Sequence, residues 1–176
     1  MGNEYSNISK SNTSSEYEII NFTKNFEVFS KIVRKFDPNY DYILKEPSDK
    51  KAVIDRISYN DIKYINAANN SILVDISTER ATGIARELSP GWLLTKDNCN
   101  SAYYIEQYIE TLNDVLPSTW HWLWEQAIGA NQLYLVCLCP PVGFCHTYIA
   151  LAYIEYTMPT HFEINVLPSW AKNIFK

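Results

Sequence analysis

Four side chains capable of metal or thiol chemistry lie within ten residues of one another near the end of the chain: Cys137, Cys139, Cys145 and His146. Thiolates and imidazoles are common zinc ligands, and a thiol with a histidine in reach is a common catalytic nucleophile. The stretch therefore raises two hypotheses, a metal site and an activated thiol. Both depend on whether the backbone brings the four groups together.

The spacing of these residues predicts strands that keep the groups apart. Cys137 and Cys139 share one face of a strand, with sulfur atoms roughly 6–7 Å apart, whereas tetrahedral zinc needs sulfur atoms about 4 Å apart. Cys145 and His146 are neighbours on the next predicted strand and face opposite sides of the sheet. The sequence thus predicts no metal site, and it favours small buried cysteines in a β-core over a catalytic thiol.

The elements around this stretch predict an α+β fold with a small, mainly antiparallel sheet. Apolar alternation and β-branched runs indicate strands near 71–77, 132–139, 142–156 and 161–167. Pro140-Pro141 blocks ladder hydrogen bonds and predicts a tight turn between two of them. The last three strands then form an antiparallel meander.

Helical spacing of apolar residues precedes and interrupts these strands. It predicts helices over 22–36, from Ser48 to about 57, over 102–113 and from Ser118 to Gly129. The polar first 16 residues predict a flexible terminus. We therefore expect a flexible segment 1–16, a helical arm 17–70 and an α+β portion 71–176.

Charge is distributed unevenly over the chain. The formal net charge is −5, and residues 71–176 carry five basic and ten acidic side chains, which accounts for all of it. No Lys or Arg occurs between Asp97 and Ala171. A surface so poor in cations releases few phosphate counterions, so nucleic-acid binding by this half is not expected. A basic partner or an amine-bearing substrate fits this acidic half better.

The run Thr119–Trp124 contains three tryptophans in five residues, Trp120, Trp122 and Trp124. A helix that packs in the core with one exposed indole is the first interpretation, and an exposed indole is a frequent part of protein interfaces. With the acidic Glu106 and Glu110, the three tryptophans form the predicted interface. Glu163 at a strand end is the candidate general base, although the sequence favours a simple outward-facing carboxylate over it.

Part of the chain resembles a known family. "NQLYLVCLCPPVGFCHTYIAL" is similar to the β2–β3 hairpin of the GNAT acyl-CoA N-acyltransferases, and "HFEINVLPSW" is similar to their β4, with Val166-Leu167-Pro168 at the Val-x-Pro motif. The resemblance covers 71–176 and implies acetyl-CoA as cofactor and Glu163 near the position of the base. The "SWAKNIFK" that follows lacks the family's Arg and glycines, so the site for the CoA pyrophosphate is missing.

The sequence favours a non-enzymatic protein-binding component, such as a virion part, an effector or an immunity-type inhibitor, with no cofactor. A degenerate GNAT-like acyltransferase is the alternative. The start Met1-Gly2 with Ser6 matches the myristoylation pattern, so a weak membrane anchor at Gly2 is a third hypothesis. No secretory signal or long apolar run is present, which predicts an intracellular protein with free thiols. Homo-oligomers remain open.

Overall fold

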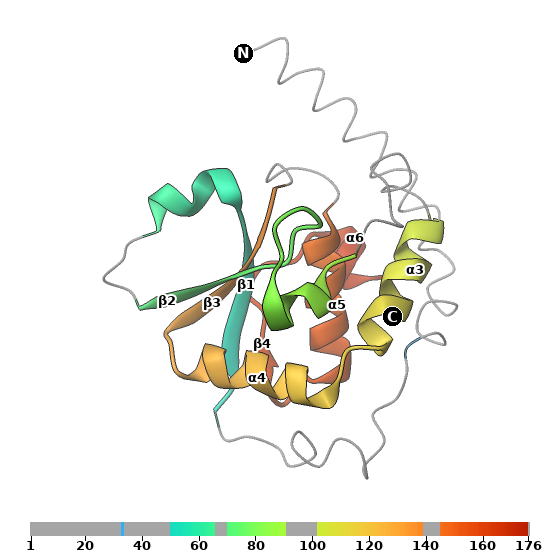
Figure 1. The fold of residues 1–176 in the computed structure, drawn as a ribbon. Helices are drawn as coiled ribbons and strands as arrows, with labels where there is room; N and C mark the ends of the chain where they lie inside the picture. The colour runs from blue at the N-terminus through green and yellow to red at the C-terminus, as the bar shows by residue number, and fades with distance from the viewer. Residues whose placement is uncertain (1–32, 34–49, 66–69, 91–101, 139–144, 176) are drawn as a thin grey trace.

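The computed structural model describes Val33 and residues 50–65, 70–90, 102–138 and 145–175. Within these ranges one sheet contains four strands, which lie in the order β2-β3-β1-β4 (Figure 1). The strands are β1 Ala52–Ser58, β2 Ser71–Asp75, β3 Gln132–Cys137 and β4 Phe162–Glu163. All three pairings are parallel.

The parallel sheet shows that the predicted antiparallel meander is wrong. Parallel neighbours need long crossover connections, and helices supply them here. Between β2 and β3 the chain forms η3 Gly83–Leu88, α3 Ala102–Asn113 and α4 Pro117–Ile128. Between β3 and β4 it forms α5 His146–Thr157. The fold is therefore α/β, with helices between strands.

The largest single error concerns the segment predicted as a strand over 142–156. From His146 onward it is the helix α5, and eight of its twelve residues are buried. A helix that is apolar on all sides shows no polar stripe, so a period of 3.6 cannot be read from its sequence. α5 lies between the sheet and α3, and α6 Ser169–Lys172 packs on it as well.

A second error concerns the helix predicted from Ser48 to 57. Residues 52–58 form β1, an inner strand of the sheet. Val53, Ile54 and Ile57 have a spacing that suits a helix face, but β-branched residues also favour strands. The buried side chains of Ala52 and Ile54 face the helices. A 3₁₀ helix, η1 Tyr59–Tyr64, follows it.

Other sequence predictions are confirmed. Strands exist at 71–75 and 132–137, and helices exist at 102–113 and 117–128. The apolar face predicted for α3 is buried in full, at 5% exposure or less for each residue: Tyr104, Ile105, Tyr108, Ile109 and Leu112. The segment 1–16 and, except for Val33, the predicted helix over 22–36 lie outside the described residues.

One face of the sheet is covered by α4 and α5, and α3 packs against α5 (Figure 1). The side chains of Ile54, Leu133 and Leu135 are fully buried there. Trp120 of α4 stacks on Tyr153 of α5, with ring centroids 5.8 Å apart. This helix-covered face contains the core of the described part of the chain.

β1 and β3 are the two inner strands of the sheet, and the connections that leave them cross. The chain that leaves β1 passes β3 to reach β2, and the chain that leaves β3 passes β1 to reach β4. In open parallel sheets, ligands bind outside the carboxyl ends of the strands. For β1 and β3 these ends are Ser58 and Cys137, which are paired in register.

Candidate functional site

Two cysteines meet at the carboxyl end of β3. Cys137 is the last residue of β3, and Cys145 is the residue that precedes α5. Their sulfur atoms lie 3.1 Å apart, and the two residues do not form a disulfide. The hydroxyl of Thr147 lies 2.9 Å from the Cys145 sulfur and 3.9 Å from that of Cys137. The fold thus assembles a compact group of two thiols and one hydroxyl.

The guanidinium of Arg56 reaches this group from β1. Its Nη2 donates to the Cys137 sulfur at 2.8 Å, and its Nη1 lies 3.5 Å from the hydroxyl of Tyr148. The same guanidinium stands 5.0 Å from the centroid of the Tyr148 ring, a cation–π geometry. Burial alone would lower the pKa of Arg56, but the sulfur atoms of Cys145 and Cys137 raise it above its usual value. Arg56 therefore stays charged next to the thiols.

His146 occupies the first position of α5, and its ring is nearly buried, at 6% exposure. Its Nε2 lies 2.9 Å from the backbone oxygen of Ile76, which can only accept, so Nε2 carries the proton and Nδ1 has a free electron pair when the ring is neutral. The ring meets that of Tyr108 edge-on, with centroids 5.7 Å apart. Burial lowers the pKa of His146, so the ring is neutral at pH 7.

Tyr108 of α3 closes the inner side of the site. Its hydroxyl donates to the backbone oxygen of Leu88 at 2.6 Å, and its ring is fully buried. Burial raises the pKa of Tyr108 well above its usual value, so the phenol remains protonated. This tyrosine positions the imidazole of His146 and does not supply a base.

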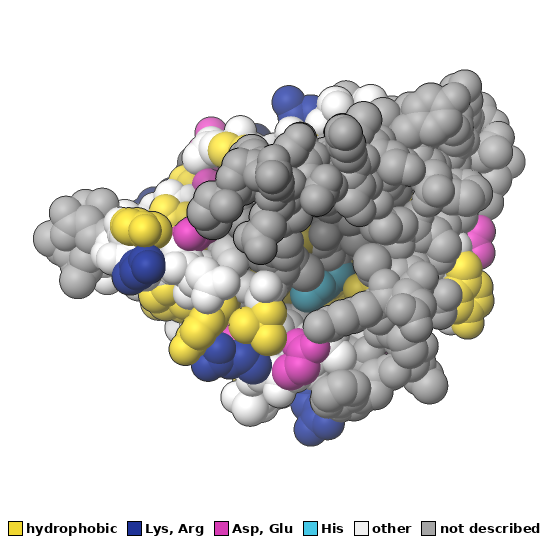
Figure 2. Space-filling view, turned by 90° about the horizontal axis from the view of Figure 1, so that it is seen from above, with side chains coloured by type: hydrophobic (Ala, Val, Ile, Leu, Met, Phe, Trp, Pro, Cys, Tyr) yellow, Lys and Arg dark blue, Asp and Glu magenta, His cyan; other side chains and the backbone are white. Residues whose placement is uncertain are grey.

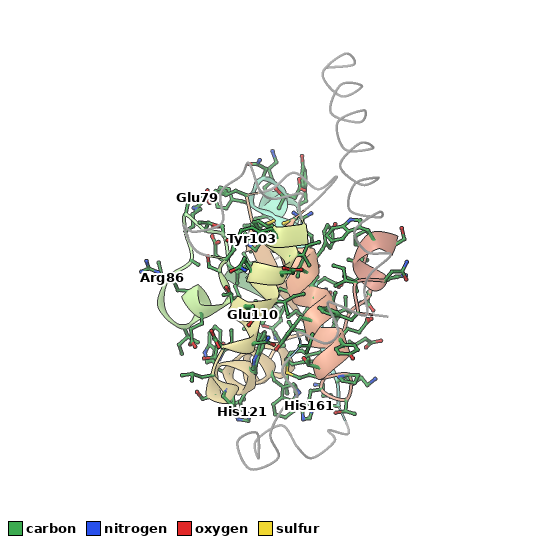
Figure 3. All side chains as sticks on the ribbon, turned by 90° about the vertical axis from the view of Figure 1, so that its right-hand side faces the viewer. Glu79, Arg86, Tyr103, Glu110, His121 and His161 are labelled. Atoms are coloured by element: carbon green, nitrogen blue, oxygen red, sulfur yellow. The ribbon has the colours of Figure 1, made fainter. Side chains whose placement is uncertain are left out.

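Figure 2 looks at the end of the molecule where β1 ends, and imidazole atoms are visible there. His121 and His161 lie at the opposite end of the molecule (Figure 3). Cys137 and Cys145 are covered, at 0% and 1% exposure, but the next residue after Cys137 is Leu138, which is 41% exposed. Both thiols are therefore buried near the carboxyl end of β3.

The spacing of these residues predicts separated thiols only if both flanking segments are strands. The geometry of a strand holds for Cys137, but Cys145 and His146 belong to the start of a helix. Two of the four groups, Cys137 and Cys145, are therefore brought together. Cys139 lies outside the described residues. In the part of the chain that the structure describes, no group of three or more His, Cys, Asp or Glu is arranged to hold a metal ion.

Sequence reasoning missed Arg56 and Thr147. Arg56 is flanked by β-branched residues in "AVIDRIS", and reading this run as a strand would have placed its side chain on one face with Ile54. Thr147 carried no signal, because its role depends on the helix that begins beside it. Both omissions follow from the errors over β1 and α5.

The other predicted site residues lie elsewhere. Glu163 is an exposed residue of β4, opposite Val53 in the ladder. Trp120 is fully buried, whereas Trp122 and Trp124 are half-buried and pack against the core. Glu106 is half-buried on α3. Glu110 is exposed on the same helix, on the side of the molecule seen in Figure 3. A protein interface formed by Trp122, Trp124, Glu106 and Glu110 stays a prediction. The Trp120 ring is buried and is not part of such a surface. Gly2 lies outside the described residues.

The buried, neutral His146 predicts a pH dependence of stability. The ordinary pKa of histidine, about 6.5, applies to the unfolded chain, and the pKa in the folded chain is lower. As the pH falls, the unfolded state therefore binds the proton first, and stability that is complete above about pH 6.5 is lost below it. We expect the free energy of unfolding to fall faster for the wild type than for His146→Gln, whose amide can still donate to Ile76. Urea titrations between about pH 5.5 and about pH 8 measure this, and equal slopes would contradict it.

Among the described helices, none combines the length and the apolar character that a membrane span requires. Comparison with protein-family models, with curated proteins and with solved structures finds no match for this chain. The resemblance to the GNAT family therefore stays a prediction, and the geometry of the site is the basis for the function.

Proposed function

We propose that this chain is a thiol-dependent oxidoreductase that exchanges a dithiol for a disulfide at Cys137 and Cys145. The observation that carries the proposal is the distance of 3.1 Å between the two sulfur atoms. A movement of about 1 Å would bring them to the length of a disulfide bond. Reactive pairs of this kind work when one thiol attacks and its neighbour resolves the mixed disulfide.

The surroundings favour Cys137 as the attacking residue. The thiolate is the nucleophilic form of cysteine, and a cation beside the sulfur favours it. The guanidinium of Arg56 donates to Cys137 at 2.8 Å, and the hydroxyl of Thr147 lies 2.9 Å from the Cys145 sulfur. Both sulfur atoms are buried, and they lie against a cation and a hydroxyl rather than among apolar groups alone.

The proposed reaction is a thiol–disulfide exchange in two steps. The Cys137 thiolate attacks one sulfur of a substrate disulfide, a sulfur–sulfur bond forms, and the first substrate thiolate leaves and takes up a proton. The Cys145 thiolate then attacks the Cys137 sulfur and expels the second substrate thiolate, which is protonated in turn. Two electrons pass from the protein to the substrate, and the protein ends with a disulfide between Cys137 and Cys145.

The test uses the full chain with Cys99→Ser and Cys139→Ser, so that the proposed pair are the remaining cysteines. The reduced protein is mixed with bis(2-hydroxyethyl) disulfide, and the released thiol is counted. We expect two thiols per protein and a Cys137–Cys145 crosslink in the peptide mass spectrum. In the same background, Cys145→Ser should release one thiol and keep a mixed disulfide, whereas Cys137→Ser should react at least about 100-fold more slowly.

The single-cysteine variants are matched controls for each other, since they differ only in which sulfur remains. Equal behaviour of the two would contradict the assignment of Cys137 as the attacking residue. If the parent protein releases no thiol and forms no crosslink in redox buffers of any potential, the proposed function is wrong.

A further inference from the structure

Ser58 is a buried polar residue beside the thiol pair. It ends β1, it is 1% exposed, and its hydroxyl has no hydrogen-bond partner among the described residues. Ser58 pairs in register with Cys137, and neighbouring strands lie about 4.8 Å apart. Because Arg56 is two residues earlier on the same strand face, the serine hydroxyl belongs to the side of the sheet that holds the thiols.

An unpaired buried hydroxyl is costly, and it is expected where a ligand or an ordered water completes the site. The Ser58 hydroxyl can donate a hydrogen bond to an acceptor atom of a ligand. The Arg56 guanidinium is a second donor from the same strand, and it selects a negatively charged acceptor.

The start of α5 adds further donors. The first N–H groups of a helix have no acceptor within it, and the helix dipole makes this end positive. The backbone oxygen of Cys145, at the position before the helix, accepts from the N–H of Tyr148 at 3.1 Å, but its thiol caps none of these groups, and the first turn contains no acidic side chain. The positive end of α5 therefore points to the carboxyl edge of the sheet without a compensating carboxylate of its own.

We propose that the site binds substrates that carry an acidic group, a carboxylate or a similar oxyanion, which is held by Ser58, Arg56 and the first N–H groups of α5. The inference rests on the proposed dithiol function and specifies its substrate class, a disulfide with an acidic group close to its sulfur atoms. The acidic group would orient the disulfide so that one sulfur faces Cys137.

The test compares three small disulfides of similar size in the single-turnover assay with the full chain. Dithiodiglycolate is anionic, bis(2-hydroxyethyl) disulfide is neutral and cystamine is cationic. We expect the second-order rate constant to be at least about tenfold larger for the anionic than for the neutral disulfide, and smallest for the cationic one. The preference should decrease with added salt, because the interaction is electrostatic.

Ser58→Ala isolates the contribution of the hydroxyl. It should lower the ratio of the rate with dithiodiglycolate to the rate with the neutral disulfide about three- to tenfold, and circular dichroism reports whether the fold is intact. The matched control is Ser77→Ala. Ser77 is another buried serine, it lies two residues after the end of β2, and its hydroxyl donates to Asp75 at 2.6 Å. It should leave the anion preference unchanged.

The outcomes separate the two proposals. If all three disulfides react at equal rates, the inference about acidic substrates is overturned, but the dithiol function stands. The inference is overturned as well if Ser58→Ala lowers the rates with the anionic and the neutral disulfide by the same factor, or lowers neither. If no disulfide reacts, the proposed function fails, and the inference that rests on it fails too.

Discussion

Replacing Arg56 by glutamine is expected to slow the reaction of the dithiol with bis(2-hydroxyethyl) disulfide by roughly 10- to 100-fold. The reason is the charged hydrogen bond from the guanidinium to Cys137, which is 2.8 Å long. Hydrogen bonds to charged groups contribute about 1.5–3 kcal/mol, and each 1.4 kcal/mol corresponds to about a factor of ten. Glutamine can still donate to sulfur, but it carries no charge to favour the thiolate. Stopped-flow measurement of thiol release gives the rate.

Two further variants test whether the loss comes from the charge at this position. Arg56→Lys keeps the cation but loses the two-pronged contact with Cys137 and Tyr148, so we expect an intermediate rate. Arg80→Gln removes an exposed guanidinium that lies 3.8 Å from Asp75, and it should react like the wild type. An unchanged rate in Arg56→Gln would show that the guanidinium does not activate the thiol.

The second large effect is expected at Trp120. Trp120→Ala should lower the free energy of unfolding by about 3–5 kcal/mol, because truncation of a buried indole loses transfer free energy and leaves a cavity. The Trp120 ring is fully buried and stacks on Tyr153, so it links α4 to α5. A protein of this size commonly has a total stability of about 5–15 kcal/mol, so the loss is a large fraction of it.

Trp122→Ala is the matched control, since it removes the same side chain two positions further along α4. Trp122 is half-buried, and its loss should cost less than half as much as that of Trp120. Urea unfolding monitored by circular dichroism measures both values. A larger loss for Trp122 than for Trp120 would contradict the packing described for α4.

The sequence determined the elements that have a clear period and one polar side. α3 was predicted because its apolar residues recur at helical spacing and its acidic residues lie off that stripe, and β3 was predicted because it alternates. Apolar periodicity predicted the wrong element for α5 and β1. α5 has no polar side, so its sequence shows no helical period. The apolar residues of β1 fit both a helical and a strand period, so the sequence does not decide between helix and strand there.

The chemistry of the cysteine cluster was decided by tertiary structure. The sequence identified Cys137, Cys145 and His146 as reactive types but could not state whether the two thiols meet, because that depends on where β3 ends and α5 begins. Nor could it place Arg56, which lies 81 residues before Cys137 and meets it only because β1 and β3 pair in parallel. Parallel pairing is a long-range property, because a crossover connection, here containing helices, separates the paired strands in the sequence. The side-chain types were in the sequence, and their convergence at one end of the sheet came from the fold.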